Sequence, residues 1–334
     1  MKNALNAAPE PKASRDRVLV TGCAGFLGSQ LAQRLLEDGT DVVGIDCFTD
    51  FYPRPIKEGN VASLRDYANF ELRELDLASD PLDDVLDQVD GVYHLAAQAG
   101  VRGSFGNGFD TYLHDNVRGV QRLLEATVRH PVDSFVYASS SSVYGNAASF
   151  PTTETTERAP VSPYGMTKCA TEDLVGVYGR IHGVPSVGLR YFTVFGPRQR
   201  PDMAFSRFIA AGFAGEPITV LGDGMQVRDF TYVDDVLDAT LAAAHRRHNG
   251  GIYNVGGGTP VTLLAAVHLI EELIGRSIAI EHRDSARGDA RQTSADTSLA
   301  RKDLDFSPAV SLEEGLARQV EWMSERRSSG LKVA

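Results

Sequence analysis

The hydrophobic positions near the start of the chain change their period in a regular order. An apolar run, RVLVTG, begins at Arg17 and is followed by apolar residues at helical spacing in FLGSQLAQRLLED and by a second run, DVVGID. Continuous apolar runs indicate buried strands, and apolar residues three or four positions apart indicate helices. The order strand, helix, strand predicts a βαβ unit with parallel strands.

The same alternation continues as far as residue 188. The segments VYHLAA, SFVYASS and PSVGLRYF are predicted as strands, and TYLHDNVRGVQRLLEATVRH and SPYGMTKCATEDLVGVYGRIHG as helices. Repeated strand–helix alternation is typical of a parallel sheet covered by helices on both faces. The pattern therefore predicts an α/β chain with a Rossmann-type, doubly wound parallel sheet.

The regular alternation of strands and helices ends after Gly196. A basic loop and short helix, PRQRPDMAFSRFIAAGFAGE, precede a short strand, ITVLGDG, and the tail from Thr262 alternates helices with IAIEHR. We expect a Rossmann domain over residues 17–188 to which 229–257 return, and a smaller α/β substrate lobe over 189–228 and 258–330. Residues 1–16 are expected to form a disordered extension. Ser311 followed by Glu314 predicts a capping box at the last helix.

Charge and cysteine content narrow the range of partners. The 334 residues carry a formal net charge of -11, which argues against a nucleic-acid backbone as partner. The three cysteines lack CxxC spacing, so neither a disulfide framework nor a metal site is expected. The chain shows neither a signal-peptide pattern at its start nor a run of 18 apolar residues. We expect a cytoplasmic protein without a membrane span.

A glycine triplet follows the first strand. Gly22, Gly25 and Gly28 occur where a tight turn and close approach to a pyrophosphate require residues without Cβ, and a helix N-terminus then faces the phosphates. Asp46 ends the second strand, where a carboxylate can accept hydrogen bonds from ribose hydroxyls and would repel a 2′-phosphate. A plain glycine turn and a capping aspartate are the alternatives. The strand before and the helix after favour a cofactor, NAD rather than NADP.

Tyr164 and Lys168 lie four residues apart on one face of a predicted helix. A tyrosine with a pKa near 10 must lose roughly three units, about 4 kcal/mol, to act as a base near neutral pH. Lys168 and a positive nicotinamide ring are candidates to supply this stabilisation. Taken alone, the pair is more often a packed tyrosine beside a snorkelling lysine.

The position of Tyr164 and Lys168 relative to the predicted sheet favours the catalytic interpretation. Four serines, residues 139–142, end the strand just before the helix, at the edge where open α/β sheets bind ligands. Their hydroxyls can hold a substrate oxygen. One or two of them are expected only to satisfy backbone groups of the loop.

Several motifs in order carry a resemblance to a known family. TGCAGFLG, Asp46, HLAAQAGVR, SSSSVYG, YGMTK, RYFTVFGP and VRDFTYVDD together resemble extended short-chain dehydrogenases/reductases, specifically nucleotide-sugar epimerases and dehydratases. The resemblance implies that Ser140 hydrogen-bonds the sugar oxygen, Tyr164 is the base and Lys168 is its partner. The cofactor contacts that it implies, besides Tyr164 and Lys168, are Gly22, Gly25, Phe26, Leu27, Gly28, Asp46, Asp76, Leu77, Ala96, Ala97 and Asn116.

Family patterns also bear on the reaction. Dehydratases carry Asp-Glu where this chain has Ser141 and Ser142, and decarboxylating relatives usually keep a glutamate at the second position. C4 epimerisation therefore remains, with the decarboxylase and 4,6-dehydratase as weaker alternatives. Thr193 and GPRQRPDMAFSRFI resemble UDP-glucuronate 4-epimerases more than UDP-glucose 4-epimerases, where asparagine is typical at Thr193. The expected reaction converts UDP-glucuronate to UDP-galacturonate, and the main alternative is UDP-glucose 4-epimerisation. The alternative that is not an enzyme is a catalytically silent NAD-binding regulator.

A substrate with a carboxylate and a diphosphate needs donors. Thr193, Ser141 and Ser142 are candidates to hold the carboxylate, and guanidinium groups can bind either anion through charge-assisted hydrogen bonds. The candidate arginines are Arg200, Arg207 and Arg228. Arg287 and Asp289 match a family element around the diphosphate and the uridine ribose. The resemblance also implies a homodimer formed through the helices around residues 112–130 and 164–182.

Overall fold

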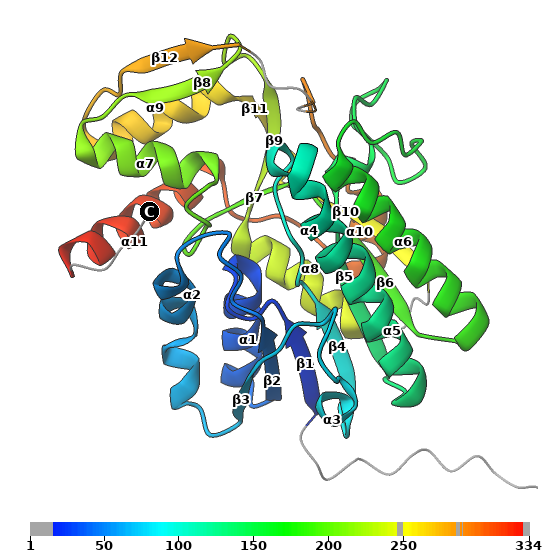
Figure 1. Cartoon of the computed structure of the whole chain (residues 1–334). Coiled ribbons are helices and arrows are strands. Elements are labelled where there is room, and N and C mark those ends of the chain that lie inside the picture. Colours follow the sequence, from blue (N-terminus) through cyan, green and yellow to red (C-terminus); the bar gives the residue numbers. More distant parts are fainter. Residues whose placement is uncertain (1–15, 246–249, 285–287, 289, 330–334) are drawn as a thin grey trace, which may run out of the picture.

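A seven-stranded parallel sheet forms the centre of the molecule (Figure 1). The computed structural model describes residues 16–245, 250–284, 288 and 290–329; residues 1–15 of the expected extension lie outside this range. The strand order is β10-β6-β5-β4-β1-β2-β3. The strands are β1 (Arg17–Thr21), β2 (Asp41–Asp46), β3 (Phe70–Glu74), β4 (Gly91–His94), β5 (Ser134–Ser140), β6 (Ser186–Tyr191) and β10 (Gly251–Val255).

The central strands are mostly apolar because both faces of the sheet are covered. In β1, Val18 and Val20 enter one buried cluster and Leu19, between them, enters the other. Alternate side chains of a strand point to opposite faces, so a strand covered twice reads as a continuous apolar run. The structure confirms the strands that the apolar runs predicted. The edge strand β3 was not predicted, because its FELRE sequence is only half-buried and lacks such a run.

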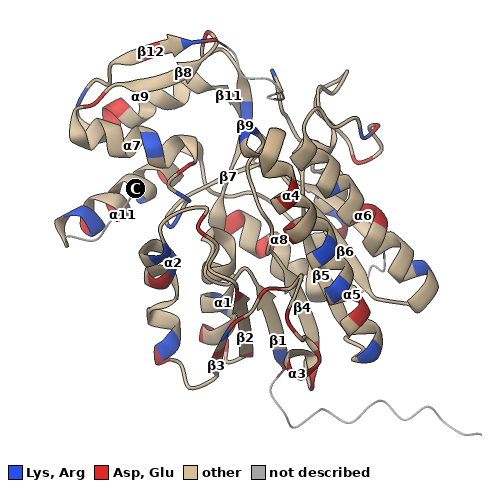
Figure 2. Cartoon of the chain, viewed as in Figure 1, with Lys and Arg blue, Asp and Glu red and all other residues tan. Residues whose placement is uncertain are grey.

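Helices cover the two faces of the sheet. One face is packed by α1 (Phe26–Glu37) and α8 (Val233–His245), and the other by α5 (Gly119–Arg129) and α6 (Pro163–His182). Smaller helices are α2 (Arg54–Val61), α3 (Asp83–Leu86) and α4 (Phe109–Tyr112), which runs through a π-helical turn, Leu113–Arg118, into α5. Charged side chains of both signs lie mainly on the helices and loops around the sheet (Figure 2).

The second lobe is built from segments on both sides of α8. A three-stranded sheet joins β7 (Thr193–Phe195), β9 (Val227–Tyr232) and β11 (Pro260–Thr262), and β8 (Ile218–Leu221) pairs with β12 (Ile280–Arg283). The remaining helices are α7 (Ala204–Ala214), α9 (Leu263–Ile274), α10 (Ser298–Leu304) and α11 (Leu312–Ser328).

The strands cross the boundaries expected from the pattern. The main sheet continues to Tyr191 in β6, beyond residue 188. Of the expected returning segment, α8 and β10 join the Rossmann unit, whereas β9 pairs with β7 and β11. As predicted, Ser311 caps α11, accepting a hydrogen bond from the Glu314 amide at 3.1 Å.

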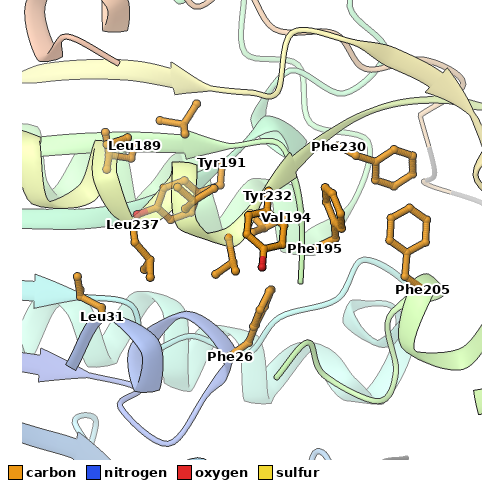
Figure 3. Packing of buried hydrophobic residues seen from close by; sticks show 14 of the residues in the cluster. Phe26, Leu31, Leu189, Tyr191, Val194, Phe195, Phe205, Phe230, Tyr232 and Leu237 are labelled. Atoms are coloured by element: carbon orange, nitrogen blue, oxygen red, sulfur yellow. The ribbon is translucent and has the colours of Figure 1, made fainter. Parts of the chain in front are cut away.

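The two lobes share one hydrophobic core. Phe195 lies at its centre, with ring centroids 5.5 Å from Phe205, 5.6 Å from Tyr232 and 6.3 Å from Phe230 (Figure 3). The same cluster includes Leu31 of α1. Continuous packing of this kind ties the lobe to the sheet, so the loops between them are held against a rigid base. None of the helices in the described residues is long and apolar enough to cross a membrane.

Candidate active site

One cavity of about 380 Å³ runs along the carboxyl ends of the central strands. Its walls come from the residues that follow the strands β1 to β6. The strand order reverses between β1 and β4, and such a switch point leaves a crevice in which open parallel sheets bind ligands. The candidate residues that line it are Gly22, Gly25, Phe26, Leu27, Gly28, Asp46, Asp76, Leu77, Ala96, Ala97, Ser140, Ser141, Ser142, Tyr164, Lys168, Thr193 and Arg200.

The glycine turn after β1 leaves no room for side chains. Gly22 has φ +69°, and a Cβ added to it would lie 2.9 Å from the Ala96 backbone. A Cβ on Gly28 would lie 2.1 Å from the Gly22 carbonyl oxygen. Gly25 is the N-cap of α1 and offers no side chain to its first amides. The turn and the free helix N-terminus fit a dinucleotide pyrophosphate.

Asp46 ends β2 beside this turn. Its carboxylate accepts hydrogen bonds from the amides of Ala24 at 3.1 Å and Phe48 at 2.8 Å, which fix its orientation and leave lone pairs for ribose hydroxyls. Lys57 of α2 was not among the predicted residues, although its buried ammonium lies 3.6 Å from Asp46. A lysine in the mostly polar stretch RPIKEGNV gives no sequence signal of this kind, because the contact depends on how α2 lies beside the end of β2.

Asn116, expected near the cofactor ribose or the active-site strand, lies behind the wall of the cavity. It lies in the π-helical turn, is 2% exposed and does not line the cavity. Its amide oxygen accepts from the Gln98 backbone amide at 2.7 Å, and its amide nitrogen donates to the Gln98 carbonyl and the Thr167 hydroxyl, both at 3.0 Å. All of these bonds are internal, so Asn116 ties the loop after β4 to α6 rather than presenting its amide to a cofactor.

The catalytic candidates come together from α6 and the end of β5. Ser162 caps α6, accepting from the Gly165 amide, and the helix then carries Tyr164 and Lys168 into the cavity. The Lys168 ammonium is buried and donates to the Ala138 carbonyl at 2.9 Å. Burial lowers the pKa of Lys168 to about 8, against the opposing charge of Glu172. The Ser140 hydroxyl accepts from the Ser142 amide at 3.1 Å.

The pKa of Tyr164 does not show the lowering expected from its neighbour. Burial of the phenol raises the pKa above its ordinary value, and the hydrogen bond with Ser140 and the charge of Arg200 act in the opposite direction without overcoming it. Removing a phenolate from water costs more than these two partners return. The protein groups around Tyr164 therefore leave its pKa above the ordinary value.

A buried ion pair lies behind the catalytic helix. Glu172, one turn after Lys168, accepts from Arg190 of β6 through Nε and Nη2, both at 2.8 Å, from the Ser139 hydroxyl at 2.5 Å and from Arg158 at 3.2 Å. This group was not predicted, although Glu172 continues the helical face of Tyr164 and Lys168. The network holds the ends of β5 and β6 against α6.

The expected substrate residues fall into three sets. Thr193 and Arg200 line the cavity with the serines after β5. Arg207 is exposed on α7 and Arg228 of β9 donates to the Val227 carbonyl at 2.9 Å; neither lines the cavity. Arg287 and Asp289 lie outside the described residues. The roles of these residues therefore stay predictions.

Comparisons with known proteins agree with this geometry. Residues 18–256 match the model of the NAD dependent epimerase/dehydratase family. A Bacillus subtilis protein named as an uncharacterized UDP-glucose epimerase is 42% identical over 310 residues, 92% of this chain and 98% of its own. A UDP-glucuronate 4-epimerase from Thermodesulfobacterium geofontis is 37% identical over 311 residues, 92% of this chain and 96% of its own.

A solved structure is similar over nearly the same length. The UDP-glucuronic acid 4-epimerase of Bacillus cereus, in complex with UDP-glucuronic acid and NAD, is 42% identical with a TM-score of 0.90, covering 92% of this chain and 99% of its own. The order of motifs, the fold and the cavity all agree with this similarity. The chain belongs to the NAD-dependent epimerase/dehydratase family.

Proposed function

We propose that this protein uses bound NAD to epimerise C4 of UDP-glucuronate, giving UDP-galacturonate. The observation that carries the proposal is the guanidinium of Arg200 in the same cavity as Tyr164, Ser140 and Thr193. A base, an oxygen-holding hydroxyl and a cation suited to a carboxylate thus stand together next to the glycine turn. The Thermodesulfobacterium relative and the Bacillus cereus structure named for this reaction support the choice.

In the reaction, the Tyr164 oxygen takes the proton of the C4 hydroxyl while Ser140 holds the same oxygen. NAD held at Gly22, Gly28 and Asp46 would supply the oxidation of C4 and its later reduction from the opposite face. Between these events the 4-keto sugar turns about its diphosphate link. Tyr164 then gives the proton back to the C4 oxygen, so the reaction is redox-neutral and needs no second substrate.

The 4-keto sugar can undergo a side reaction, decarboxylation, that the site must prevent. Oxidation at C4 of glucuronate yields a β-keto acid, which loses carbon dioxide when its C5–carboxyl bond aligns with the ketone π-system. The hydroxyls of Thr193, Ser141 and Ser142 line the cavity and are suited to hold the carboxylate away from that alignment. These donors distinguish the proposed epimerase from a decarboxylase.

The proposal is tested by incubating the purified protein with UDP-glucuronate and, separately, with UDP-glucose, and resolving the products by chromatography and NMR. We expect UDP-galacturonate from the acid and no product from the neutral sugar. UDP-galactose would identify a UDP-glucose 4-epimerase, the activity in the name of the Bacillus subtilis relative. A pentose product would show a decarboxylase, and a stable 4-keto-6-deoxy sugar a dehydratase.

We also propose that the protein is a homodimer that works in the cytoplasm. Three apolar side chains of α6 face solvent: Met166 is 40%, Val177 45% and Ile181 71% exposed. Apolar residues on one long helix face are typical of an association surface. All three cysteines are free thiols, which is consistent with a reducing compartment.

The dimer predicts a specific effect of a charge on this helix. We expect Ile181→Glu to shift the protein to a monomer in sedimentation velocity, because a carboxylate buried in an apolar interface loses its contacts with water. Met225→Glu, which places the same charge at an exposed methionine of the second lobe, is the control and should leave the mass unchanged. A dimer that persists in the Ile181 variant would rule out α6 as the interface.

A further inference from the structure

Arg200 lies in a loop that is fixed by several hydrogen bonds. The loop begins at Gly196, whose amide donates to the Gln319 side chain of α11 at 3.0 Å. Gln199, buried at 4% exposure, donates to the Val194 carbonyl and accepts from the Ser206 amide, both at 3.1 Å. Because Val194 and Ser206 hold the residue before it, the position from which the Arg200 side chain enters the cavity is fixed.

The guanidinium of Arg200 already has a partner in its own loop. Its Nε donates to Oδ1 of Asp202 at 2.9 Å and its Nη2 to Oδ2 at 3.0 Å, while its Cζ lies 5.7 Å from the centre of the Phe51 ring. The side chains of Arg200 and Asp202 are 20% and 36% exposed. A carboxylate on the Nε edge leaves the N–H groups of Nη1 free for a second oxyanion.

We propose that Asp202 is a positioning residue that weakens the grip of Arg200 on the carboxylate of the sugar. The inference rests on the proposed function. The pair carries no net charge, so an incoming carboxylate meets hydrogen-bond donors rather than a full positive charge. This difference matters in an epimerase, because the sugar ring must leave its first orientation, turn, and be held again in the second. A grip that is too strong in the ground state stabilises the substrate more than the transition state for turning, and so slows the reaction.

The position of Asp202 suits this role. It lies two residues after Arg200 in the same fixed loop, so its distance to the guanidinium does not depend on lobe movement. Among the described residues, three cations line the cavity: Lys57 lies beside Asp46, Lys168 donates to the Ala138 carbonyl, and Arg200 is paired with Asp202. The balance between Arg200 and Asp202 therefore sets the charge that an acidic sugar meets there.

The test is Asp202→Asn, which keeps the size of the side chain and removes its charge. We expect the dissociation constant for UDP-glucuronate, measured by calorimetry, to fall roughly fivefold, the upper range for a solvent-accessible ion pair. The kcat for UDP-glucuronate should fall together with KM. The affinities for UDP-glucose and for UDP should stay unchanged, because neither ligand carries the carboxylate.

Three further results would overturn the inference. Tighter binding of UDP by Asp202→Asn would show that Arg200 meets the diphosphate. An equal loss of affinity for all ligands would show that Asp202 is merely structural, and unchanged kinetic and dissociation constants would show that it has no influence. Asp202→Glu keeps the charge, so its kcat and KM for UDP-glucuronate should be close to those of the wild-type protein. A thermal melt checks that both variants fold. Asp83→Asn removes the exposed carboxylate that Arg129 contacts at 2.8 Å, remote from the cavity, and serves as control. If the wild-type protein leaves UDP-glucuronate unconverted, the proposed function itself fails.

Discussion

Replacing Tyr164 by phenylalanine should lower kcat for C4 epimerisation by about 10²- to 10⁴-fold, the range for loss of a general acid–base group. The variant keeps the ring, which packs at 6.2 Å from the ring of Tyr112, and loses only the hydroxyl that takes the C4 proton. Substrate affinity should change little, because the hydroxyl acts on the reacting atom. The measurement is the rate of UDP-galacturonate formation, with the dissociation constant of UDP-glucuronate determined in parallel.

Tyr93→Phe is the matched control for this variant. Tyr93 of β4 is also buried, at 4% exposure, but does not line the cavity, so losing its hydroxyl should leave the rate unchanged. Retention of most of the activity in the Tyr164 variant would assign the base to another residue. The cofactor content of both variants, measured after denaturation, shows whether a loss of rate arises from the missing hydroxyl or from a missing cofactor.

Glu172→Gln should destabilise the protein by roughly 3–5 kcal/mol, the cost of breaking a buried ion pair by removing one partner. The Glu172 side chain is 1% exposed and that of Arg190 5% exposed, so the guanidinium of Arg190 would stay in the interior without its counter-charge. The measurement is the free energy of unfolding from chemical denaturation at pH 7.

The neighbouring carboxylate offers the control. Asp173→Asn removes a charge one residue further along α6, where the exposed side chain contacts Arg158 at 2.7 Å, and should cost less than about 1 kcal/mol. Equal losses in the two variants would contradict the special role of the buried pair.

The effect of Glu172 should also depend on pH. Burial opposes ionisation, but the hydrogen bonds and charge of Arg190 hold the pKa of Glu172 below its ordinary value. A lowered folded pKa contributes stability that is present above the unfolded pKa, about 4.3, and is lost as the pH falls through the folded pKa. The difference in stability between the wild-type protein and Glu172→Gln should therefore be full at pH 7 and narrow in acid.

The parts of the site that are local in sequence were predictable. Gly22, Gly25 and Gly28 lie in one turn in which a side chain would collide with the backbone, and Asp46 ends the strand that pairs with the one before that turn. Tyr164 and Lys168 share a helix face because they are one turn apart. In each case the geometry follows from the period of a strand or helix, which the sequence states directly. The continuous apolar runs identified the doubly covered sheet for the same reason.

The contacts between distant segments were decided only by the tertiary structure. Asn116 was expected at the cofactor, yet its amide is used by Gln98 and Thr167, because the π-helical turn brings it behind the cavity wall. Arg200 and Arg207 lie in one basic stretch and Arg228 in a later motif, but of the three only Arg200 lines the cavity. A residue type states what a side chain can bind, whereas the packing of separate elements decides which partner is within reach, and that packing depends on the whole core at once.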